Sequence, residues 1–532
     1  MDAPTLSMKP KHAAATLTAL VLAAGVANIN LSVANVALPT IGLAFDASQD
    51  ALNLVAVAYT LGLAGTVLYL GALGDRFGRK RMLLIGVAVS IPAALLAAFA
   101  PSLPALVLAR LIGGIAAGAA YPTTLSLITA LWSGKARTQA IAIWSGAGAA
   151  LSVMGPLSAG WILEWATWGT AFLVAIPLAL VSVVLVIAVV PSGVHESTQP
   201  VDHLGGVLSV VAVSSLAFAV HTLASPDQAG KALAFIAVAL VAGGVFAWRQ
   251  LHVAEPLFDL RIARRRVFWV AAISGMIVFG SLTGAIYVGQ LFLQNVLGYS
   301  PFEAGLSILP AAILLLLCAP LSGVLVERYG SRLVFLLGFG VALAGFAMML
   351  LTWNIHTGVV PVGVAYGLIG IGAGLAGLPS SRALTGSVPV RRAGMASSTS
   401  DLQRDLGAAV LQSLLGAVLT IGYTASFGKQ VAAANASQGA GATIGPDVAS
   451  QLQKSFSGAE QIAKQYPDYH DQVISAARDS FLAGAQAAYL IGIIAMAVGA
   501  TIIAIWFPGR ARENELLAEY ARADAEPAVP RP

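Results

Sequence analysis

Long apolar runs recur along the whole chain and constrain its fold more than any other feature of the sequence. An α-helix needs about 20 apolar residues to cross the hydrocarbon core of a bilayer, and it satisfies its own backbone hydrogen bonds there. The sequence therefore predicts an all-α membrane protein with fourteen transmembrane helices. Their approximate limits are 14–38, 51–71, 82–100, 104–131, 138–162, 169–190, 205–224, 230–248, 268–295, 303–326, 333–353, 358–380, 394–424 and 482–506.

The composition excludes the common alternatives. Of the 532 residues, 58% are hydrophobic and only 10% are charged, whereas soluble proteins carry about 25% charged residues. The net charge of +5 does not indicate nucleic-acid binding, because the basic residues are scattered in short segments between the apolar runs. The single cysteine, Cys318, excludes an internal disulfide and a thiolate metal cluster. No Gly-x-x-x-x-Gly-Lys phosphate loop is present, so we expect neither ATP-driven pumping nor a cofactor or metal.

The distribution of lysine and arginine predicts the orientation. With the N-terminus inside, the inner segments hold Lys9, Lys11 and the cluster at 76–81, together with most later arginines. The outer segments keep only Lys231 and the four basic residues of a long polar segment at 425–480. Because lysine and arginine are retained on the cytoplasmic side, we expect a multi-pass protein of the inner (plasma) membrane with both termini cytoplasmic. The basic start of the chain runs into an apolar stretch without a plausible cleavage site, which predicts an uncleaved first span.

A short cationic stretch follows the second apolar run, and we call it the gating stretch. It reads Gly71-Ala72-Leu73-Gly74-Asp75-Arg76-Phe77-Gly78-Arg79-Lys80-Arg81. Asp75 falls where the next helix would begin, which predicts that it caps that helix. Gly71 and Gly78 permit a tight backbone. Composition alone is equally compatible with an ordinary cytoplasmic loop.

A second copy of this pattern lies far downstream, at 323–332. It repeats Gly-x-Leu-x-acid-Arg-x-Gly-x-basic, with Glu327 in the place of Asp75. Two related halves are the repeat signature of a secondary transporter. We therefore expect a conformational gate formed by Gly71, Asp75, Arg76, Gly78, Arg79 and Glu327.

The gating stretch resembles the cytoplasmic signature of the major facilitator superfamily, Gly-x-Leu-x-Asp-Arg-x-Gly-Arg-Lys, at every one of those positions. The resemblance implies two six-helix bundles related by pseudo-symmetry, and here two further helices are inserted between them. We accordingly divide the chain into an N-terminal bundle (1–195), the inserted pair (196–255), a C-terminal bundle (256–510) with its long outer loop (425–480), and a cytoplasmic tail (511–532).

Two helices carry more specific similarities. Gly155-Pro156-Leu157-Ser158-Ala159-Gly160 resembles the exporter motif of this superfamily, with Ala159 as a departure. A Gly-Pro pair bends a helix, and spaced glycines allow close helix contacts. The stretch from Asn30 to Pro39 resembles the first-helix signature of the fourteen-helix drug:proton antiporters, matching at Asn35, Ala37, Leu38 and Pro39. Asn30 stands where that family has an acid, and Asn30 cannot titrate.

Ionisable residues within spans are costly and therefore candidates for function. Asp401 and Asp405 are four residues apart, so they share one helix face, and Arg404 is close enough to hold Asp401 ionised. Asp405 is then the better proton carrier, since burial disfavours its charged form. The alternative is simple pairing of these acids with Arg391 or Arg392. Arg110 matches the helix 4 pattern of proton-coupled facilitators, or else it holds helix 4 against a neighbour.

Uncharged polar residues within spans are predicted to line a substrate cavity. Tyr287, Gln290 and Gln294 recur at helical spacing, and we add Asn30, Asn35 and Tyr59.

The predicted function is proton-coupled antiport that exports amphipathic or cationic drugs by alternating access. The partners would be a small amphipathic substrate, protons and the lipid bilayer, and we expect a monomer that is not an enzyme. The alternatives are a dedicated exporter of one natural product, lipid or siderophore and, more remotely, a non-transporting membrane receptor. Two copies of the gating stretch disfavour the receptor.

Overall fold

The computed structural model describes residues 10–192, 201–222, 229–253, 256–389, 393–438 and 444–525. Within these residues the chain is helical and forms no strand. The first half contains α1 (Ala13–Phe45), α2 (Gln49–Phe77), α3 (Arg79–Ala98), α4 (Leu103–Leu131), α5 (Gly134–Leu163), η1 (Trp168–Val174), α6 (Ala175–Val189), α7 (His203–Thr222) and α8 (Ala229–His252). The second half contains α9 (Leu260–Ala263), α10 (Arg266–Asn295), α11 (Pro301–Leu306), α12 (Leu309–Tyr329), α13 (Ser331–Thr352), α14 (Val359–Gly386), α15 (Ala393–Gln438), α16 (Pro446–Lys454), α17 (Phe456–Gln465), η5 (Pro467–Tyr469), α18 (His470–Trp506) and α19 (Arg510–Ala525).

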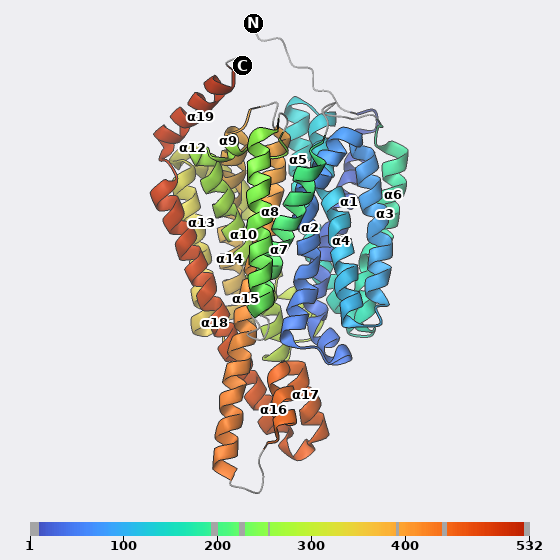
Figure 1. Ribbon diagram of the computed structural model, residues 1–532, viewed down its shortest axis with the longest axis vertical. Helices are drawn as coiled ribbons and strands as arrows, with labels where there is room; N and C mark the ends of the chain where they lie inside the picture. The colour runs from blue at the N-terminus through green and yellow to red at the C-terminus, as the bar shows by residue number, and fades with distance from the viewer. Residues whose placement is uncertain are drawn as a thin grey trace.

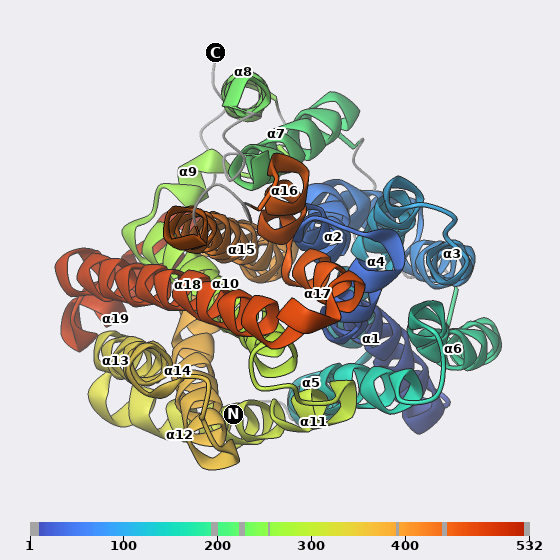
Figure 2. The same cartoon turned by 90° about the horizontal axis from the view of Figure 1, so that it is seen from below.

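The helix count confirms an all-α membrane protein. Among the described residues, thirteen helical stretches are long and apolar enough to span a bilayer, with η1–α6 and α11–α12 each counting as one. Helix α5, with 30 residues, packs against α1 and completes the fourteen (Figure 2). Lysine and arginine residues outside the described ranges, such as Lys9, Arg391 and Arg392, are not placed.

The helices form two groups that lie side by side. Seen along the bundle, α1–α6 gather on one side and α10–α15 with α18 on the other, while α7 and α8 lie together at the edge (Figure 2). Helix α7 packs against α2 of the first group and α15 of the second. Helix α8 contacts mainly α7, and most of its surface faces outward. This is the arrangement of two six-helix bundles plus two inserted helices.

Asp202 ties the inserted pair together just before α7 begins. Its carboxylate accepts hydrogen bonds from the Gly205 N–H at 2.9 Å, from Arg249 Nε at 2.7 Å and from Gln250 Nε2 at 2.9 Å. Burial raises the pKa of Asp202, but these three donors outweigh it and bring the pKa below its ordinary value. The N-terminus of α7 is thereby capped and joined to the end of α8.

The two halves repeat one local structure where the sequence repeats. Gly78 and Gly330 both adopt positive φ, 109° and 86°, and each separates two consecutive helices. Two residues further on, Lys80 donates to the Ile187 carbonyl near the end of α6. Its counterpart Arg332 donates to the Ala504 carbonyl near the end of α18. Each half thus uses one cation to satisfy the last carbonyls of its sixth helix, where a positive charge is favoured.

The polar segment at 425–480 is largely helical. Helix α15 continues to Gln438 and α18 begins at His470, so both extend beyond the bundle (Figure 1). Beside this extension, α16 packs against α15 and α17 packs against α18. Leu452, Phe456 and Ile462 are buried in this extension. It lies at the opposite end of the molecule from the start of α1 and from α19 (Figure 1).

Candidate functional site

The two acids of α15 lie inside the molecule with one arginine between them. Arg404 Nη2 is 3.3 Å from Asp401 Oδ1, and Arg404 Nε is 3.4 Å from Asp405 Oδ1. The side chains of Asp401 and Asp405 are only 7% and 5% exposed, and that of Arg404 is 35% exposed. The sequence predicted that Arg404 would favour Asp401. The structure instead shares it between both acids, because the guanidinium reaches Asp401, one turn back along the helix, and also its direct neighbour Asp405.

Tyr121 of α4 completes this cluster from the other half of the molecule. Its hydroxyl accepts a hydrogen bond from Arg404 Nη1 at 3.1 Å, and the guanidinium lies 4.7 Å from the centre of its ring. The sequence pattern did not single out Tyr121. The available signal was a large polar side chain directly after the run of small residues 116–120 in an apolar helix.

The cluster has an uncompensated acid. Two carboxylates face one guanidinium, so one negative charge is uncompensated when both are ionised, and Asp405 Oδ2 has no hydrogen-bond partner among the described residues. A buried ion that lacks a partner is destabilising by several kcal/mol in a low-dielectric interior. The arrangement therefore favours the arrival of one more positive charge, which a proton or a cationic molecule can supply. The alternative pairing with Arg391 or Arg392 concerns residues outside the described ranges.

Arg110 does not belong to the acid cluster. Its guanidinium donates to the carbonyls of Asn30 and Leu31 in α1 and lies 4.7 Å from the centre of the Tyr59 ring. Arg110 and Tyr121 are 11 residues apart on α4, a rise of about 16 Å. Arg110, a candidate for proton coupling, forms no ion pair with these acids in the part of the chain that the structure describes. Its contacts hold α4 against the middle of α1.

Asn30 and Asn35 occupy the interior of α1 without forming an ionic site. The Asn30 amide donates to the Val26 carbonyl of its own helix at 2.9 Å. Asn35 is buried, and its Oδ1 has no partner among the described residues. Tyr59 is buried as well, and its hydroxyl donates to the Ala27 carbonyl at 3.1 Å. Of these three side chains, Tyr59 is the one that joins α2 to α1 by a hydrogen bond.

The polar face of α10 is largely packed against other described residues. Tyr287 and Gln290 are completely buried, and Gln290 Nε2 donates to the Ala304 carbonyl of α11 at 2.7 Å. Gln294 donates weakly to the Gln290 carbonyl at 3.4 Å. The expected cavity-lining role is not visible, because this part of α10 lies where the two halves are pressed together near α16 and α17.

The gating stretch is helical for most of its length. Helix α2 continues to Phe77, so Gly71, Asp75 and Arg76 lie in its last turns, and the N-cap of α3 is Gly78. Asp75 therefore does not cap α3, contrary to prediction. Its carboxylate instead accepts from Arg79 Nε at 3.0 Å across the break at Gly78. Arg79 is 1% exposed and also donates to the Ser126 carbonyl of α4 at 2.6 Å. Together these bonds fix the ends of three helices.

The second copy is held differently. Glu327 is exposed and has no ion pair among the described residues. Ser331 stands at the position equivalent to Arg79, and its buried hydroxyl donates to Glu513 of α19 at 2.6 Å. Arg510, also of α19, donates to the Arg328 carbonyl at 2.9 Å. The sequence placed Glu513 in the cytoplasmic tail with no role, since nothing local marks a single acid in a polar helix.

The exporter-motif residues of α5 form close contacts. A Cβ atom at Gly155 would lie 2.2 Å from Ser32 Oγ of α1, and one at Gly160 would lie 2.6 Å from the Pro301 carbonyl oxygen at α11. The Pro156 carbonyl lies 3.0 Å from the ideal Cβ position of Gly305, also in α11. The motif thus brings α5 against its own half on one side and against the other half on the other side.

This fold and its repeated gating stretch define the class of protein. The sequence profile of the Major Facilitator Superfamily matches residues 20–412, and the chain belongs to this superfamily of transporters. Helices α18 and α19 lie after the end of the matched region.

Individual relatives match most of the chain. It is 31% identical to the multidrug efflux pump LfrA of Mycolicibacterium smegmatis over 95% of this chain and 98% of that protein. It is 30% identical to the methyl viologen resistance protein SmvA of Salmonella typhimurium over 88% of this chain and 92% of that protein. Among solved structures, a bacterial homologue of the human lysosomal transporter Spinster, inward-facing and unoccupied, has a TM-score of 0.60 at 17% identity, covering 97% of this chain and 98% of that chain.

Proposed function

We propose that this protein exports amphipathic or cationic drugs across the inner membrane in exchange for protons. The single observation that carries the proposal is the α15 cluster, where Asp401 and Asp405 share Arg404 and one carboxylate oxygen stays unpaired. Such a site accepts either a proton or a cation but not both, and this competition is what antiport requires. The relatives named as multidrug and methyl viologen resistance proteins support the same substrate class.

Alternating access would come from movement between the halves 1–195 and 256–510. The gating stretch and its second copy lie at the end that carries α19, and the basic residues there indicate that this end is cytoplasmic. The α16–α17 end is then the outer end. The halves contact each other at that outer end, for example α5 with α11, and these contacts support closure on the outside in the described conformation. A single copy of the chain is sufficient for this transport cycle, so we propose a monomer.

Protons entering down their gradient supply about 2.3 kcal/mol per charge per 100 mV. We expect Asp405→Asn to abolish the dependence of efflux on the pH gradient, with at least a tenfold loss of driven efflux, because the amide cannot release a proton. Substrate binding should persist, since the amide resembles the protonated acid in shape and charge.

The measurement is efflux of a cationic dye in everted vesicles with and without a pH gradient, beside equilibrium binding of the same dye to purified protein. Asp447→Asn in the exposed part of α16 is the matched control and should behave as wild type. Full gradient-driven efflux by Asp405→Asn would rule out this cluster as the coupling site. Transport of only one natural product in a substrate panel would favour a dedicated exporter.

A further inference from the structure

The outer segment, α16 and α17, is built onto the second half of the molecule. Tyr423 of α15 donates its hydroxyl to the Leu452 carbonyl at 2.9 Å, and Thr424 donates to the Gln453 carbonyl at 3.2 Å. The ring of Phe456 packs edge-on against Phe481 of α18, with centres 6.1 Å apart. These contacts fasten the segment to α15 and α18, so it moves with their half.

The same segment forms hydrogen bonds and an ion pair with the first half around the turn between α1 and α2. Gln451 Nε2 donates to Asp46 Oδ1 at 2.6 Å, and Lys454 Nζ is 2.6 Å from Asp46 Oδ2. Gln461 Nε2 adds a bond to the Leu43 carbonyl at 3.3 Å. Both carboxylate oxygens of Asp46 are therefore held by side chains of the opposite half.

Asp46 itself is in an unusual conformation. It ends α1 with φ 47° and ψ 48°, and it is the only non-glycine residue with positive φ among those described. Aspartate tolerates this conformation better than most residues, but it still persists mainly where surrounding contacts fix it. The turn is thus presented to the outer segment in one fixed geometry.

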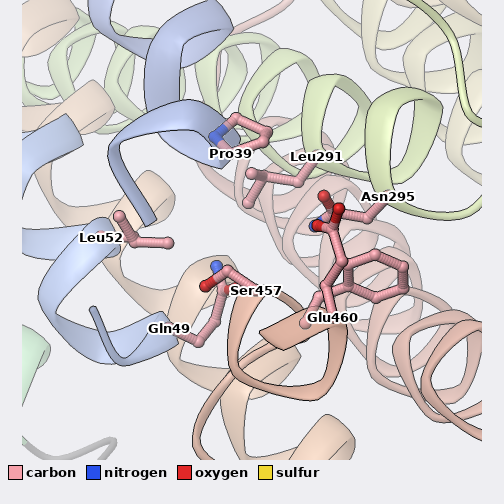
Figure 3. Close-up of a pocket in the computed structure, with 8 residues that line it drawn as sticks. Pro39, Gln49, Leu52, Leu291, Asn295, Ser457 and Glu460 are labelled. Carbon is pink, nitrogen blue, oxygen red and sulfur yellow. The ribbon is translucent and has the colours of Figure 1, made fainter. Parts of the chain in front are cut away.

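A small pocket lies directly beneath this contact. Pro39 of α1, Gln49 and Leu52 of α2, and Leu291 and Asn295 of α10 line it, and Phe456, Ser457 and Glu460 of α17 close it (Figure 3). Its walls come from both halves and from the outer segment. Separation of the halves at this end would have to open the pocket and part Asp46 from α16.

We propose that Asp46, Gln451 and Lys454 form an outer latch that stabilises the outward-closed conformation and must release before the outer side opens. The contacts cross between the halves, so they exist only while the outer side is closed. The latch therefore biases the conformational equilibrium, and it does so without touching the α15 acids. It rests on the inferred direction of opening, but not on proton coupling or on the identity of the substrate.

The test measures access to the closed outer side. Gln49 is 2% exposed and lines the pocket, so Gln49→Cys in a Cys318→Ala background reports opening by its rate of reaction with a membrane-impermeant maleimide. The Lys454 and Asp46 side chains are 30% and 43% exposed. The gain from their pair is correspondingly modest, and Lys454→Gln should raise the labelling rate about threefold to fivefold.

Charge reversal sharpens the result. Lys454→Asp should raise the rate further through repulsion, and the swap Asp46→Lys with Lys454→Asp should bring it back towards the starting rate. Lys464→Gln is the matched control, because Lys464 pairs with Glu460 of its own helix at 3.2 Å and does not cross the halves. An unchanged rate in Lys454→Asp, no recovery in the swap, or an equal effect of Lys464→Gln would each overturn the latch.

Discussion

At the residue scale, the two copies of the gating stretch differ in what holds them. In the first copy, Asp75 satisfies a guanidinium whose side chain is almost completely buried, and the same guanidinium reaches the Ser126 carbonyl of α4. In the second copy, Glu327 points to solvent. Asp75 should therefore contribute more to the stability of its copy than Glu327 does to the other. The reason is that a buried charge depends on its partner far more than an exposed charge does.

We expect Asp75→Asn to reduce transport strongly and Glu327→Gln to have little effect. The amide at position 75 keeps one acceptor for Arg79 but removes the opposing charge, which weakens this contact by about 1–3 kcal/mol. Dye efflux should fall by at least fivefold while membrane expression stays normal. Transport assays normalised to the amount of protein in the membrane check this. Equal losses from the two substitutions would show that the halves contribute alike.

At the element scale, α19 holds separate parts of the second half together, and we call this helix the clasp. Arg265, immediately before α10, binds Asp524 through two nitrogens at 2.6 and 2.9 Å. Glu513 accepts from Ser331 at the start of α13. The helix therefore joins the ends of elements that are distant in the sequence.

This clasp makes a prediction that a double-mutant cycle can check. Ser331→Ala and Glu513→Gln should each lower the free energy of unfolding, and the double variant should lose less than the sum, with a coupling of about 0.5–3 kcal/mol. Thermal unfolding of the purified protein in detergent measures all three variants. Strict additivity would mean that the 2.6 Å contact contributes nothing to stability.

Patterns within one helix were readable from the sequence, whereas contacts between helices were not. Apolar length alone predicted the helix count, and the repeat of glycine, acid and arginine predicted two related halves. The sequence could not show that Arg110 faces α1 while Tyr121 faces α15, because both lie on one apolar helix and only packing decides which neighbour each meets. It likewise could not show that Asp75 continues α2, since Asp75 could form an N-cap or an intrahelical pair with equal ease until the break at Gly78 was placed.

At the scale of the whole molecule, the proposed alternating access requires that the two halves come together at each end in turn. At the outer end the closure depends on backbone-to-backbone approach, because Gly160 of α5 meets Pro301 with no space for a side chain. The contact is thus steric, unlike the electrostatic latch at Asp46, and a single methyl group is enough to challenge it. Closure at this end therefore has two physically independent supports.

We expect Gly160→Val to wedge the halves apart on the outside. Its Cβ would lie 2.6 Å from the Pro301 carbonyl oxygen, so either the helices separate or the backbone shifts. Labelling of Gln49→Cys by an impermeant maleimide should rise by about tenfold, corresponding to a bias of about 1.4 kcal/mol, and net efflux should fall. Gly340→Val is the control, since a Cβ there meets nothing within 4 Å and adds only a β-branched residue to a helix. If Gly160→Val folds, transports normally and leaves the labelling rate unchanged, the α5–α11 contact is not part of the outer closure. Combined with Lys454→Gln, its effect on labelling should multiply, because the two contacts are separate and their free energies add.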